Sequence, residues 1–202
     1  QILPRDYLIT RDELAFAVVD YGFEEARATC FLRYRRPNAS TWEKLSTDES
    51  HLLLKQNYPH YLFESKKRDT IIHGVPIERI DSHRSAQLAI ESLRNTEPQR
   101  SVRQRAGEAV NYLISLGVQP AHLGISGSLL IGAETDHSDI DLVCYDSSAF
   151  AKVRQCFATS SGPFSELSTE QWKNTYRRRG TPMEFDSFLW HEQRKHNKAM
   201  IG

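Results

Sequence analysis

Gly127-Ser128-Leu129-Leu130-Ile131-Gly132-Ala133-Glu134-Thr135-Asp136-His137-Ser138-Asp139-Ile140-Asp141-Leu142 is the stretch on which the interpretation of this sequence depends. It follows an apolar segment at 122–126 that is typical of a short strand, and residues 128–133 are predicted to form a brief helix. A Gly-Ser pair at such a junction lets backbone N–H groups approach an anion closely, and the Ser128 hydroxyl adds a further donor. We therefore expect Gly127 and Ser128 to bind an anionic group such as phosphate.

Two aspartates follow in a second predicted strand, at 140–145. Because side chains alternate along a strand, Asp139 and Asp141 are expected on one face, while Ile140 and Leu142 point toward the core. Two carboxylates about 7 Å apart repel each other unless a cation lies between them, and oxygen ligands of this kind suit Mg²⁺. The alternative is an ordinary pair of acids that face solvent.

The charge distribution favours a cation site. The chain has 26 Lys and Arg against 26 Asp and Glu, so its formal net charge is zero, which gives no global case for a nucleic-acid or membrane coat. No Lys or Arg lies between Arg105 and Lys152, however, and this interval contains six acids: Glu108, Glu134, Asp136, Asp139, Asp141 and Asp146. A stretch so acidic in a neutral protein indicates bound metal.

The spacing of the whole stretch resembles the signature of the DNA polymerase β-type nucleotidyltransferase superfamily. Gly127-Ser128 is followed by three residues, Gly132, five residues and then the Ser-Asp-x-Asp-Leu run at 138–142. The flanking regions also resemble uncharacterised archaeal and cyanobacterial predicted nucleotidyltransferases. Many members carry an arginine among the three residues after Gly-Ser, and here those residues are apolar.

The resemblance implies both a fold and a reaction. The fold would be a small mixed β-sheet flanked by helices. The reaction would transfer a nucleoside monophosphate from an NTP, the donor substrate, to an acceptor hydroxyl with release of pyrophosphate. Gly127 and Ser128 would bind the triphosphate, and the catalytic Asp139 and Asp141 would be ligands of Mg²⁺ or Mn²⁺. The motif does not choose the acceptor, which could be an RNA end, a protein hydroxyl or a small molecule.

Members of this superfamily use a third carboxylate, for which the sequence offers alternatives. If residues 183–186 form a strand, Glu184 and Asp186 would face the metals. Thr181-Pro182-Met183-Glu184 also matches a capping box that opens a helix, the interpretation we prefer, and the third acid could then lie beyond Gly202. Without a third acid, the chain could be a catalytically silent nucleotide- or RNA-binding module that retains the fold.

The chain as a whole is predicted to be α+β, with a β-rich N-terminal module at 1–82 and a nucleotidyltransferase domain at 83–202. Strands are expected at 6–10, 14–20 and 28–35, and further helices at 83–94, 102–116 and 148–158. Ser101 is a candidate N-cap, and Gly117 a candidate left-handed stop.

Three widely spaced cysteines and the lack of a long apolar run predict a cytoplasmic protein without a membrane span. A basic segment at 172–198, with net charge +4 (seven cations against three acids) and interleaved aromatic residues, could meet triphosphate or an RNA backbone, or be a solvated face. In the N-terminal part, Tyr34 with the arginines around it at 33–36, and the cations at 66–68, could also touch nucleic acid, although ordinary surface charge is the interpretation we prefer.

Overall fold

The computed structural model describes residues 1–38, 40–94 and 101–202, and it confirms an α+β protein. The chain divides into two compact units. The first unit comprises residues 1–89 and 124–143, and the second comprises residues 90–123 and 144–202. The motif at 127–142 therefore clusters with the N-terminal strands. These units reflect which residues lie close together and do not test the predicted domain bounds. The domains at 1–82 and 83–202 stay a prediction.

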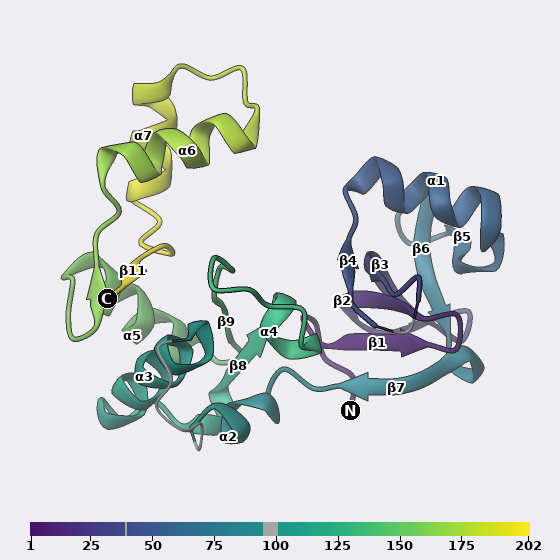
Figure 1. The fold of residues 1–202 in the computed structure, drawn as a ribbon, viewed down its shortest axis with the longest axis horizontal. Helices are drawn as coiled ribbons and strands as arrows, with labels where there is room; N and C mark the ends of the chain where they lie inside the picture. The colour runs from purple at the N-terminus through teal and green to yellow at the C-terminus, as the bar shows by residue number, and fades with distance from the viewer. Residues whose placement is uncertain (39, 95–100) are drawn as a thin grey trace. The chain divides into compact units, whose positions relative to one another are not determined.

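An antiparallel sheet forms most of the first unit (Figure 1). Its strand order is β5-β6-β3-β2-β1-β7, and the two-residue β4 pairs with the end of β3. The predicted N-terminal strands are confirmed. The strands are β1 (Tyr7–Thr10), β2 (Leu14–Glu24), β3 (Arg27–Arg35), β4 (Glu43–Lys44), β5 (Leu62–Ser65), β6 (Thr70–Pro76) and β7 (Ile80–Arg84).

Helix α1 (Thr47–Asn57) packs against one face of this sheet (Figure 1). It buries Leu54 completely beside Phe16 and Leu32. The helix begins with a capping box in which Ser46 and Glu49 exchange hydrogen bonds between side chain and backbone. This helix was not predicted, although its Ser-x-x-Glu start is present in the sequence.

The helix predicted at 83–94 begins too early and needs correction: residues 80–84 form β7, and α2 begins only at Ala89. The register of β7 against β1 pairs Arg84 with Tyr7. The buried carboxylate of Asp6 explains why these residues form a strand and not a helix. It accepts a hydrogen bond from the Ala86 backbone amide at 2.8 Å and pairs with His83 Nε2 at 2.7 Å. These long-range contacts outweigh the local helical pattern.

The central strand β3 separates from β6 in its middle, and two side chains complete its hydrogen bonding there. The last register pair of the two strands is Thr29 with Gly74. Beyond it, the Leu32 amide donates to His73 Nδ1 at 3.2 Å, and the Leu32 carbonyl accepts from Ser50 Oγ at 2.9 Å. Because Nδ1 accepts, a neutral His73 carries its proton on Nε2. Burial lowers the pKa of His73 to about 4.

Replacing His73 with asparagine is expected to remove part of the acid sensitivity of the fold. The unfolded chain takes up a proton on His73 below about pH 6.5, whereas the folded chain does so only near pH 4, so folding stability falls as pH falls through this window. Asparagine keeps an acceptor for Leu32 and does not titrate. Urea unfolding at pH 7 and pH 4.5 should show a pH-dependent loss smaller by about 2 kcal/mol in the variant. Equal losses of unfolding free energy in the wild type and the variant would contradict the low pKa of His73 in the folded protein.

The second unit is mainly helical, and its predicted helices at 102–116 and 148–158 are confirmed within two residues. Ser101 caps α3 by accepting from the Gln104 amide, and Gly117 follows the helix with a φ of 84°. The helices and strands of this unit are α2 (Ala89–Arg94), α3 (Val102–Ser115), α5 (Ser147–Ala158), α6 (Thr169–Arg179), α7 (Phe185–Gln193), β10 (Phe164–Ser165) and β11 (Met200–Ile201), with the 3₁₀ turn η3 (Pro120–His122). Two further 3₁₀ turns, η1 (Pro59–Tyr61) and η2 (Ile77–Arg79), belong to the first unit.

Residues 183–186 form no strand, so the strand interpretation of Glu184 and Asp186 is wrong. Glu184 is the N-cap of α7, and Asp186 lies in the first turn of this helix. The helical alternative is right in type, but the helix begins at Phe185, three residues later than a capping box that starts at Thr181 predicts. Tyr176 Oη donates to the Met183 carbonyl at 2.6 Å, which holds residue 183 in a turn outside the helix.

Part of the basic segment at 172–198 is engaged inside the second unit. The carboxylate of Glu192 is buried and pairs with Arg179, Lys195 and Lys198. These hydrogen bonds and charges outweigh burial and hold the pKa of Glu192 at about 2, well below its usual value. No described helix is long and apolar enough to cross a membrane.

Candidate functional site

A strand, a short helix and a second strand position the motif, as predicted. They are β8 (Leu123–Ser126), α4 (Gly127–Ile131) and β9 (Asp141–Cys144), and β8 pairs with β9 in a two-stranded sheet. All four residues of β8 are buried. Gly132, in the left-handed conformation with a φ of 73°, ends α4 after five residues. A helix this short adds little dipole, so anion binding here depends on individual donors.

Gly127 and Asp141 lie in direct contact. Gly127 has a φ of 67°, and a Cβ added to it would collide with Oδ2 of Asp141 and lie 3.2 Å from its carboxyl carbon. Residue 127 therefore has no room for a side chain. The structure thus brings the Gly-Ser corner and the second aspartate of the motif together, although fourteen positions separate them in the sequence. Ser128, the next residue, is half-buried.

The two aspartates are exposed, and the hydrophobic residues beside them are half-buried. Asp139 precedes β9 and Asp141 is its first residue. Although Asp141 reaches solvent, surrounding protein atoms partly desolvate its carboxylate, which raises its pKa; the negative charge of Asp139 raises it further. The repulsion shows that the two carboxylates are close enough to interact. A divalent cation would relieve it, so this donor pair fits Mg²⁺ or Mn²⁺.

Three cations oppose this negative charge, and all come from the N-terminal part of the chain. Arg5, Lys44 and Arg33 each lower the pKa of Asp141, against the two effects that raise it. Arg33 lies on β3 and also hydrogen-bonds the side chain of Tyr7. These side chains supply the positive charge that the motif itself lacks.

Hydrophobic packing holds the motif against the N-terminal strands. Leu130, Ile131 and Ala133 pack on a buried cluster that includes Tyr7 and Tyr34, whose ring centroids are 6.0 Å apart. Ser126 Oγ donates to the Arg5 carbonyl at 2.7 Å. Leu130 and Ile131, two residues of the apolar run that follows Gly127-Ser128, are thereby used for this packing.

From the sequence we did not predict Arg5, Lys44 or Tyr7 as site residues, and we preferred to place Arg33 and Tyr34 on an ordinary charged surface. The sequence contains one signal for the missing cations. No Lys or Arg occurs in the 46 residues at 106–151, so a phosphate bound at the motif needs cations from elsewhere in the chain. Among the residues that the structure describes, no group of three or more His, Cys, Asp or Glu side chains is placed to hold a metal. Asp139 and Asp141 are accordingly the donor pair this site offers.

Comparison with known proteins gives one relative. The chain is 24% identical to an uncharacterized protein of Methanocaldococcus jannaschii, over 98% of this chain and 64% of the relative. The chain thus spans less than two thirds of the length of the protein it matches. No family model matches the chain, and no solved structure matches it.

Proposed function

We propose that this protein is a metal-dependent nucleotidyltransferase that moves a nucleoside monophosphate from an NTP to an acceptor hydroxyl. The observation that carries the proposal is the contact between Gly127 and the carboxylate of Asp141. This contact places the Gly-Ser corner, which suits phosphate, directly beside the carboxylate of Asp141, which the negative charge of Asp139 repels. Phosphate and carboxylate oxygens together are the ligands that Mg²⁺ prefers.

The roles of the residues follow from their chemistry. The backbone at Gly127 and the Ser128 hydroxyl bind phosphate oxygens of the donor. Asp139 and Asp141 would hold the metal, which when bound would draw electron density from the phosphate oxygens and ease loss of the acceptor proton. Arg5, Arg33 and Lys44 offset the negative charge of the triphosphate.

The reaction balances as a displacement at the α-phosphorus. The acceptor oxygen forms a bond to the α-phosphorus and releases its proton to solvent water, while the bond between the α-phosphorus and the α,β-bridging oxygen breaks and pyrophosphate leaves with that electron pair. The acceptor stays open among an RNA end, a protein hydroxyl and a small molecule. A cytoplasmic location is part of this proposal.

Pyrophosphate release tests the proposal directly. The protein is incubated with each of the four NTPs, with Mg²⁺ or Mn²⁺, and with an RNA pool or protein alone as acceptor. We expect release of pyrophosphate with at least one NTP and its loss on addition of EDTA. Metal-linked NTP binding without release under any condition would favour the silent binding module. No metal-linked binding of any NTP would overturn both.

A further inference from the structure

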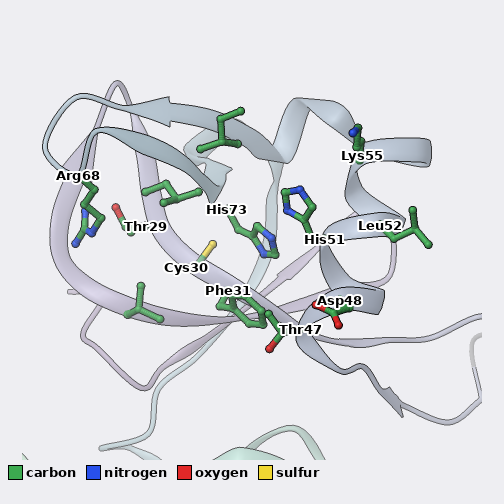
Figure 2. Close-up of a pocket in the computed structure, with 13 residues that line it drawn as sticks. Thr29, Cys30, Phe31, Thr47, Asp48, His51, Leu52, Lys55, Arg68 and His73 are labelled. Atoms are coloured by element: carbon green, nitrogen blue, oxygen red, sulfur yellow. The ribbon is translucent and has the colours of Figure 1, made fainter.

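A cavity of about 590 Å³ lies in the first unit, away from Gly127 and the two aspartates. Its walls are residues of β2, β3, α1 and β6, and Figure 2 shows them around the hollow. The cavity forms where β6 separates from β3, the point at which His73 and Ser50 complete the hydrogen bonds of Leu32. Its volume is within the range of pockets that bind small ligands.

Parallel rings form the floor of this cavity. The His73 imidazole stacks on the Phe31 ring, with centroids 4.6 Å apart and planes 13° from parallel. The His73 ring also stacks with the His51 ring, with centroids 6.0 Å apart and planes 17° from parallel. His73 and Phe31 are held by the sheet, whereas His51 lies on α1 and is exposed. A flat ring can therefore extend a stack that the fold has already ordered.

The mouth of the cavity combines exposed apolar side chains with two cations, Lys55 and Arg68, and one acid, Asp48. Val19, Leu52 and Ile71 are 54%, 53% and 62% exposed. Lys55 and Arg68 lie on opposite sides of the two imidazole rings in Figure 2. Arg68 is paired with Asp20, and no carboxylate among the described residues pairs with Lys55. The mouth thus offers apolar surface for the faces of a ring and positive charge for an anion attached to it.

We propose that this cavity binds the base of a nucleotide, with its phosphate groups near Lys55 and Arg68. A nucleobase has a π-face for the ring stack and polar edges for the His73 Nε2–H and the Thr29 hydroxyl. An apolar peptide side chain would match the rim but would leave Lys55 and the imidazole donor without a polar partner. A mononucleotide and a nucleotide within a single strand present the same chemistry. This site is separate from the proposed metal site, and the proposal does not depend on nucleotidyl transfer.

The test measures nucleotide binding with the metal site silenced. AMP and a short 5′-labelled oligouridine are titrated into the full chain in EDTA, by calorimetry and by fluorescence anisotropy. His51→Ala and Lys55→Ala are compared with Gln56→Ala, a matched control on the same helix that does not line the cavity. Both substituted side chains are exposed, and circular dichroism checks that each variant is folded.

We expect His51→Ala to weaken binding about tenfold, the loss of one base stacking contact, while Gln56→Ala binds like the wild type. Lys55→Ala should weaken binding and reduce its salt dependence. An effect on AMP identifies a mononucleotide site, and an effect confined to oligouridine identifies a strand site. The proposal is overturned if neither ligand binds the wild type, if His51→Ala binds both as the wild type does, or if an apolar dye occupies the cavity and neither nucleotide displaces it.

Discussion

Replacing Asp141 with asparagine is expected to lower pyrophosphate release by at least about a thousandfold while the protein stays folded. Asparagine keeps the size of the side chain but removes the charge that would hold the metal, and loss of a bound metal removes several kcal/mol of transition-state stabilisation. Pyrophosphate release and calorimetric binding of Mg²⁺ with an NTP measure the loss. Asp81→Asn, at an exposed acid on β7 of the same unit, is the matched control and should leave both unchanged.

The same substitution is expected to leave the melting temperature unchanged or to raise it. Desolvation and Asp139 raise the pKa of Asp141 in the folded protein, so the folded chain binds this proton more tightly than the unfolded chain does. Stability from this group therefore falls as pH rises above the ordinary pKa of an aspartate, and at neutral pH the carboxylate destabilises the fold. Asparagine removes that cost. A variant that loses activity because it unfolds near room temperature would contradict this account.

Local sequence patterns were enough to predict the two strands and the short helix that position the motif. The expected strand, helix and strand at 122–126, 128–133 and 140–145 each match an observed element within two residues, because Gly132 and the alternation around Ile140 are strong local signals. The first three strands of the sheet were predicted for the same reason. Hydrophobic periodicity and turn residues within each segment determine these elements, without contacts to distant residues.

Contacts between distant residues account for what could not be predicted. Residues 83 and 84 were predicted to begin a helix, yet contacts with Asp6 and β1 place them in the strand at 80–84. The cations near Asp141 come from β3, β4 and the residue before Asp6, between 97 and 136 positions away in the sequence. Spacing within the motif indicates which ligand it suits, but only the fold shows which other segments complete the site.

Gly127→Ala is expected to reduce metal-linked NTP binding and pyrophosphate release by at least about a hundredfold. Two effects combine at this position. The φ of 67° costs an alanine about 1 kcal/mol, and the new methyl group would overlap the Asp141 carboxylate. Either the carboxylate or the Gly-Ser corner must move, and both are required at the proposed site.

Gly132→Ala separates these two effects. Gly132 has a nearly equal φ of 73°, but a Cβ there would meet no atom within 4 Å. This variant should lose about 1 kcal/mol of stability from backbone strain and keep its activity within a few-fold. Melting temperatures and pyrophosphate release, measured side by side, compare the two. If both alanine variants behave alike, backbone strain alone explains the requirement for glycine, and the contact between Gly127 and Asp141 has no part in function.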